Sequence, residues 1–95
     1  MYGTIWRYGR VAGSPEDLTR AGHELAAVLG QAPGFVACAV LDTDDGGASV
    51  GLFERRADLD EADRLVARWT AEHLAGRLPE APRSTSGEVV AQRGI

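Results

Sequence analysis

The chain has 95 residues, of which 44% are hydrophobic, and its formal net charge at pH 7 is −4. This size predicts one domain, residues 1–95, with a small core. The ten basic residues form no run that could neutralise successive phosphates, so we expect binding to neither nucleic acid nor membrane surfaces. With one cysteine, no secretion signal and no apolar stretch of about 18 residues, the sequence predicts a cytoplasmic protein.

Residues 2–8 are rich in aromatic and β-favouring side chains and predict the first strand. Alternation along a strand places Ile5 and Arg7 on one side and Trp6 and Tyr8 on the other. The alternation alone does not decide which of the two sides faces the interior.

A helix is predicted from residue 15 to about residue 29. Ser14 is a typical N-cap, Pro15 suits the first helical position, and two acids follow in the first turn, where the helix dipole favours them. Apolar and small residues recur at helical spacing on one face: Leu18, Ala21, Gly22, Leu25, Val28, Leu29 and Ala32. His23 lies opposite this stripe and is expected on the surface.

Two almost wholly apolar strands are predicted next, at residues 35–41 and 48–53. The acidic, glycine-rich segment 43–47 between them predicts a hairpin turn, and we read its acids as turn residues rather than as cation ligands. Cys38 lies among alanine and valine, so we expect a small buried residue and not a reactive thiol.

A second helix is predicted over residues 59–78, ended by Pro79, and a fourth strand over residues 88–92. The apolar stripe of this helix includes one histidine: Leu59, Ala62, Leu65, Val66, Trp69 and His73. We therefore expect both Trp69 and His73 to face the sheet.

The predicted order β-α-β-β-α-β is that of an α+β, ferredoxin-like fold, a four-stranded antiparallel sheet with both helices on one face. Two helices cover one face of a sheet, yet the second strand is apolar on both. Its predicted faces are Phe35, Ala37, Ala39 and Leu41 on one side and Val36, Cys38 and Val40 on the other. The uncovered face requires a partner, and the simplest is an identical sheet in a two-fold homodimer.

The sequence also resembles the dimeric α+β barrel superfamily, and within it the small proteins of the antibiotic biosynthesis monooxygenase type. The resemblance rests on the element order, the PGF motif at 33–35, the LFE motif at 52–54 and the helix that carries Trp69. It implies a homodimer in which two sheets close into a barrel, with a pocket in each subunit between sheet and helices. Some members of this family are oxygenases that use O2 without metal or flavin on electron-rich polycyclic phenols.

Two residues are the candidates for catalysis. His73 lies one helical turn from Trp69 and could exchange a proton near neutral pH, and Arg7 could stabilise a phenolate or an oxyanion. Five residues are candidates for the wall of a substrate pocket: Trp69, Trp6, Tyr8, Leu65 and Phe35. The alternative is that Trp69 is ordinary core, that His73 binds a backbone carbonyl and that Arg7 extends into water.

Two histidines and one cysteine without ligand spacing predict no metal site, and we expect no cofactor. The resemblance also implies that haem degradation would need an asparagine, and the chain has none. The predicted function is a cofactor-independent monooxygenase-like activity, an oxidoreductase reaction, on a small hydrophobic or aromatic ligand of polyketide type. The alternatives are a non-catalytic dimeric ligand-binding or accessory module, and a polyketide-cyclase-like or isomerase-like enzyme on the same barrel.

Overall fold

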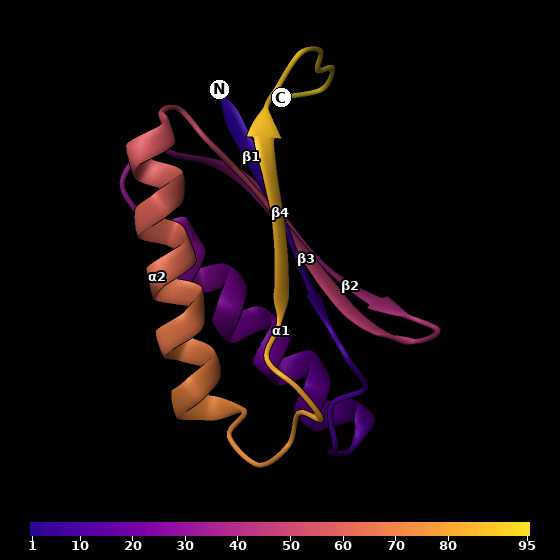
Figure 1. Cartoon of the computed structure of the whole chain (residues 1–95). Coiled ribbons are helices and arrows are strands. Elements are labelled where there is room, and N and C mark those ends of the chain that lie inside the picture. Colours follow the sequence, from indigo (N-terminus) through magenta and orange to yellow (C-terminus); the bar gives the residue numbers. More distant parts are fainter.

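The computed structural model describes all 95 residues, and it places both helices on one face of a four-stranded sheet (Figure 1). The elements are β1 (Tyr2–Tyr8), α1 (Pro15–Gly30), β2 (Phe35–Thr43), β3 (Gly46–Phe53), α2 (Arg56–His73) and β4 (Arg83–Glu88). All strand pairs are antiparallel, in the order β2-β3-β1-β4. This confirms the predicted ferredoxin-like α+β fold. Neither helix is long and apolar enough to cross a membrane.

The first helix forms where its local signals place it. The Ser14 side chain accepts a hydrogen bond of 3.2 Å from the backbone N–H of Asp17, and Pro15 occupies the first turn. This cap satisfies one of the N–H groups that a helix start leaves without a partner. The apolar stripe then faces the sheet, with Leu25 and Leu29 fully buried.

The second helix is shorter at its C-terminal end than predicted, and its buried face differs. It stops at His73 and not at residue 78: Leu74 is the C-cap, and Gly76 adopts a left-handed conformation (φ +77°) in the turn that follows. The chain has therefore left the helix before it reaches Pro79. Thr70 and Leu74 are buried, whereas His73 is exposed, so the expectation that His73 faces the sheet is wrong. Because a turn takes 3.6 residues, the buried positions at this end of the helix are Trp69, Thr70 and Leu74, and position 73 lies beside them on the exposed side.

The fourth strand was predicted at residues 88–92 but forms at Arg83–Glu88. The prediction followed the apolar residues near position 90, whereas the strand that pairs with β1 is polar and exposed along its whole length. Pairing with β1 outweighs the weak β propensity of this serine-rich segment. Val90 lies beyond the strand and is 96% exposed.

A β-bulge changes the faces predicted for the second strand. The register with β3 shifts between Phe35 and Ala37, so the side chain of Phe35 joins the helix-covered side. There it meets Phe53 edge-on, with ring centroids 6.2 Å apart. The strict alternation that grouped Phe35 with Ala37 fails because a bulge inserts one residue that has no partner.

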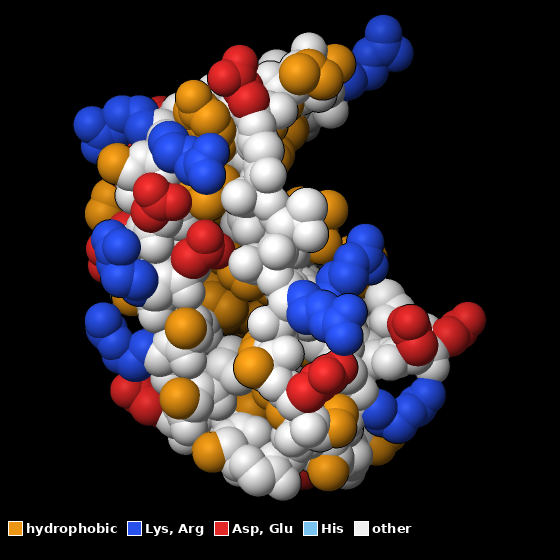
Figure 2. Space-filling view, viewed as in Figure 1, with side chains coloured by type: hydrophobic (Ala, Val, Ile, Leu, Met, Phe, Trp, Pro, Cys, Tyr) orange, Lys and Arg blue, Asp and Glu red, His pale blue; other side chains and the backbone are white.

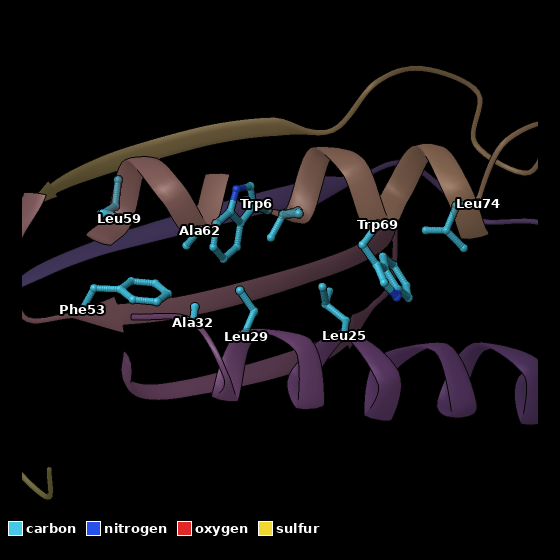
Figure 3. Close-up of a cluster of buried hydrophobic side chains, with 10 residues drawn as sticks. Trp6, Leu25, Leu29, Ala32, Phe53, Leu59, Ala62, Trp69 and Leu74 are labelled. Atoms are coloured by element: carbon cyan, nitrogen blue, oxygen red, sulfur yellow. The ribbon is translucent and has the colours of Figure 1, made fainter. Parts of the chain in front are cut away.

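The core lies between the helices and the sheet (Figure 3). Trp6 and Phe53 come from the sheet, and α1 and α2 supply most of the remaining side chains. The helix-facing positions of β3 other than Phe53 are small: Gly47, Ser49 and Gly51. A side chain at Gly51 would meet the rings of Phe53 and Trp6, at 2.9 and 3.2 Å from the new carbon. Gly51 is therefore required for both aromatic rings to pack.

The opposite face of the sheet is apolar and has no helix over it. The strand register places Ile5, Val50 and Ala39 side by side across its centre. Leu41 at its edge is 48% exposed. We call this surface the open sheet face, and it consists of Ile5, Ala37, Ala39, Leu41, Val50 and Leu52, with Arg7 at one end.

Candidate functional site

A large hollow with reactive side chains lies between α1 and the sheet, and we call it the α1 pocket. Its volume is about 1040 Å³, and 14 of its 24 lining residues are hydrophobic. Glycines are among the lining residues on both of its sides, Gly22 on α1 and Gly47 on β3. Cavities of this size hold drug-sized molecules. The polar or reactive side chains that line it include Tyr8, Arg10, His23, Cys38 and Asp42.

Trp69 forms the inner wall of this pocket. Its side chain extends from α2 towards Leu25 of α1 (Figure 3), and it is 6% exposed. The ring of His73 stacks on the indole from the other side, with centroids 5.1 Å apart and planes at 17°. Trp69 is therefore held between the core and the imidazole and presents a rigid aromatic surface.

Tyr8 supplies a neutral hydrogen-bond donor. Its hydroxyl lies 3.3 Å from Oγ of Ser49, a fully buried residue of β3. Burial raises the pKa of the phenol above its usual value, and the Ser49 and Thr70 hydroxyls oppose that rise. Thr70 Oγ1 is itself buried without a hydrogen bond of ordinary geometry. The Tyr8 phenol thus keeps its proton at neutral pH and can donate it to an oxygen atom.

Arg10 and His23 also line the pocket, and neither was among the predicted site residues. Arg10 follows β1, and its Nη2 donates a 2.6 Å hydrogen bond to the carbonyl oxygen of Asp44 in the β2–β3 turn. His23 lies on the exposed side of α1, as predicted, but it still lines the pocket. Arg10 was detectable, since continuing the alternation of β1 past Tyr8 places it on the same side.

The two residues predicted to be catalytic do not come together. Arg7 is exposed and its side chain lies on the open sheet face, because its neighbours Trp6 and Tyr8 both face the helices. His73 is exposed on α2, where its Nδ1 donates a 3.0 Å hydrogen bond to the carbonyl oxygen of Trp69. Neither residue lines the α1 pocket.

Of the predicted wall residues, Trp69 and Tyr8 line the α1 pocket and the other three do not. Trp6 is 3% exposed and its Nε1 donates a 2.9 Å hydrogen bond to Oδ1 of Asp63 on α2. Leu65 and Phe35 are partly buried and pack against the core. The predicted wall residues therefore lie in the layer between sheet and helices, but only two of them line the same pocket.

Cys38 faces α1, with its Sγ 4.0 Å from the carbonyl oxygen of Ala26. Burial raises the pKa of the thiol, so it is not a thiolate at neutral pH. No group of three or more histidine, cysteine, aspartate or glutamate side chains is arranged to hold a metal ion. The chemistry that the α1 pocket offers is thus hydrogen bonding from Tyr8 and Arg10 beside an aromatic wall.

No protein-family model matches the sequence, and no curated protein is significantly similar to it. Solved structures do match. A variant of SnoaB, a cofactor-independent oxygenase from Streptomyces nogalater, superimposes with a TM-score of 0.70 at 18% identity, over 96% of this chain and 94% of that one. A protein of the antibiotic biosynthesis monooxygenase type from Nitrosomonas europaea gives a TM-score of 0.74 at 18% identity, over 96% and 100%.

A dimeric ferredoxin-like protein from Thermobifida fusca gives a TM-score of 0.71 at 12% identity, over 93% of this chain and 90% of that one. These matches span nearly the whole chain. The chain therefore shares the ferredoxin-like α+β fold of these proteins. At identities of 12 to 18% the likeness shows the fold alone, and the chemistry of the chain has to be argued from the residues of its own pocket.

Proposed function

We propose that the protein is a homodimeric, cofactor-independent monooxygenase-like enzyme that acts on a small, flat aromatic substrate of polyketide type. The observation that carries this proposal is the α1 pocket, an apolar hollow of about 1040 Å³ with Trp69 as its wall and Tyr8 and Arg10 as its donors. A planar ring system would lie against the indole, and its oxygen atoms would accept hydrogen bonds from the phenol and the guanidinium.

The chemistry of such a substrate supplies its own electrons. In an anthrone, loss of one methylene proton gives an enolate, which passes an electron to O2, and the two radicals combine at that carbon to a peroxide. The O–O bond then breaks, the carbon becomes a carbonyl, and the second oxygen leaves as water with the two methylene hydrogens. In this proposal Arg10 and Tyr8 stabilise the enolate oxygen, and His23 accepts the proton at the pocket mouth. Arg10 and His23 thus take the roles that the sequence suggested for Arg7 and His73.

Replacing Arg10 with alanine should lower kcat/KM for the oxidation of 1,8-dihydroxyanthrone about tenfold, because one charged donor to the enolate is lost. The measurement is O2 uptake together with quinone absorbance, corrected for the rate in buffer. Arg20→Ala is the matched control, since Arg20 lies exposed on α1 and does not line the pocket.

Trp69→Phe should raise KM more than it lowers kcat, because the smaller ring offers less surface to the substrate while both hydrogen-bond donors remain. Wild-type protein that only equals the buffer rate would refute the enzyme proposal.

A non-catalytic ligand-binding module is the second candidate, and a specific observation favours it. The histidine nearest to Trp69 uses its Nδ1 on a backbone carbonyl and does not line the pocket. A binding module predicts that anthraquinone quenches the tryptophan fluorescence of wild-type protein, while O2 uptake stays at the buffer rate. The same pair of measurements therefore separates the two functions.

The homodimer is the second part of the proposal, and the open sheet face supports it. Apolar side chains occupy the centre of that face on three adjacent strands, and no element of the chain covers them. A second copy offers the same surface and satisfies it by two-fold symmetry. Dimerisation through this face would leave the α1 pocket on the outside of the sheet pair, one in each subunit.

A further inference from the structure

A second hollow lies on the other side of α2, between this helix and β4, and we call it the α2 groove. Its volume is about 520 Å³, and Figure 2 shows hydrophobic atoms in its floor. Its walls include Trp6 from β1, Asp63, Ala67, Thr70 and Ala71 from α2, and Ser84 from β4. None of the residues discussed above as donors in the α1 pocket lines it.

The α2 groove exists because both of its walls are built from small residues. Ala67 and Ala71 lie four residues apart on α2, so they share one side of the helix, and Ala75 lines the groove just past the end of the helix. On β4, Ser84 pairs with Trp6 and therefore points to the helix-covered side. An alanine row opposite a serine strand cannot fill the gap that large apolar side chains would normally close.

The charge in the α2 groove has one sign. The charged residues that line it are Asp63 and Glu80, and no arginine lines it. Glu80 has Arg83 at 3.9 Å, but none of the five ion pairs in the structure involves Asp63. Asp63 is partly buried, and its Oδ1 takes the indole hydrogen bond from Trp6. Oδ2 of this carboxylate therefore remains available to a donor in the groove.

We propose that the α2 groove binds a small organic cation, with its ammonium group on Oδ2 of Asp63 and its apolar body along Ala67 and Ala71. An ammonium group supplies a hydrogen-bond donor to this carboxylate and the positive charge that balances it. A neutral alcohol would donate a hydrogen bond without the charge, and a carboxylate ligand would be repelled. This site does not depend on the proposed oxygenase activity, because it lies on the opposite side of α2.

The test uses three probes of equal length and different charge. Hexylammonium, hexanol and hexanoate are titrated separately into ¹⁵N-labelled full-length protein, and amide shifts are followed. We expect hexylammonium to shift Ala67, Ala71 and Ser84, to bind about tenfold more tightly than hexanol, and hexanoate to cause no shift there. Equal binding of hexanol, or shifts confined to the α1 pocket or the open sheet face, would overturn the proposal.

Asp63→Asn isolates the charge, because the amide oxygen can still accept the hydrogen bond from Trp6. We expect this variant to bind hexylammonium about tenfold more weakly. Asp60→Asn is the control, since Asp60 lies one turn away on α2 and its side chain is 52% exposed beside Arg56. Unchanged binding by Asp63→Asn, or equal losses in both variants, would contradict the assignment of Asp63.

The stability of Asp63→Asn tests, without any ligand, whether the charge of Asp63 is poorly balanced within the protein. Burial, and then the charge of Asp60, raise the pKa of Asp63, while Trp6 and Arg56 oppose the rise. Because its pKa is raised, the carboxyl of Asp63 contributes to the free energy of unfolding when it is protonated, at low pH. This contribution is lost as the pH rises through the folded pKa. Asp63→Asn should therefore increase the free energy of unfolding at pH 7, with the gain vanishing below about pH 4. Urea unfolding at pH 7 and below pH 4 measures this change in the free energy of unfolding. A loss of stability at pH 7 would contradict the proposal, because the carboxylate would then serve to hold Trp6 and not to receive a cation.

Discussion

Replacing Gly34 with alanine should lower the free energy of unfolding by about 3 kcal/mol. Gly34 has φ +69°, a region that costs any residue with a Cβ, and the new carbon would lie on the carboxylate of Asp58. That carboxylate cannot move away easily, because it is 4% exposed and accepts two 3.1 Å hydrogen bonds from Arg55. The methyl group of alanine therefore costs stability in two ways, through the positive φ and through the contact with Asp58.

Urea unfolding measures this effect, and Gly30→Ala is its control. Gly30 is exposed at the end of α1, and a side chain there would meet nothing within 4 Å. That substitution should stabilise the protein by about 0.5 kcal/mol, since alanine favours a helix over glycine. A Gly34→Ala protein as stable as wild type would contradict the geometry of this turn.

The double variant Gly34→Ala/Asp58→Ala separates the two penalties. With the carboxylate absent, the most severe part of the clash disappears, and what remains is the cost of the positive φ and the contact with Cβ of residue 58, 2.9 Å from the new carbon. We therefore expect the double variant to be more stable than the sum of the two single losses predicts. Additive losses would show that the backbone conformation alone explains the requirement for glycine.

The contacts of Gly34 also connect two motifs that lie apart in the sequence, PGF and LFE. The carbonyl oxygen of Gly34, in the PGF motif, accepts a 2.8 Å hydrogen bond from the backbone N–H of Glu54, in the LFE motif. Asp58 and Arg55 then begin α2 directly beside this contact. The junction of β2, β3 and α2 is thus fixed at the end of the sheet, and it sets the position of the helix that carries Trp69.

The element order was predictable because each element carries local signals. Ser14 and Pro15 start α1, the acidic turn separates β2 from β3, and the apolar runs mark both strands. Where the prediction failed, contacts distant in sequence decide the structure. The serine-rich β4 forms by pairing with β1, and the bulge near Phe35 follows from the register with β3. Neither pairing leaves a signal in the strand's own sequence.

The candidate site was only partly predictable for the same reason. Trp69 and Tyr8 were identified by type and position, and both line the α1 pocket. The face of β1 could not be assigned, because its two sides carry Ile5 with Arg7 and Trp6 with Tyr8, and either set could be buried. Small residues on both walls create the hollows themselves, and a pattern search for reactive side chains does not detect a space that glycine, alanine and serine leave open.

Placing a charge at the centre of the open sheet face should have the second large effect. Val50 lies between Ile5 and Ala39 in the strand register, so Val50→Glu puts a carboxylate in the middle of the proposed dimer interface. Two-fold symmetry would bury two such groups near each other without a cation. We expect the dissociation constant of the dimer to rise at least about 1000-fold, measured by sedimentation over a range of concentrations.

Ala27→Glu distinguishes this result from a general effect of added charge, because Ala27 is exposed on α1, far from the sheet's open side. It should leave the dimer intact. Since a stable dimer raises the apparent stability of its subunits by mass action, Val50→Glu should also make the unfolding midpoint independent of protein concentration, whereas the midpoint of wild type rises with it. A wild-type chain that sediments as a monomer at high micromolar concentration would leave Ile5, Val50 and Leu52 facing water, and that result would contradict the two-fold pairing of the sheets. The α1 pocket would remain, because all of its walls come from one chain.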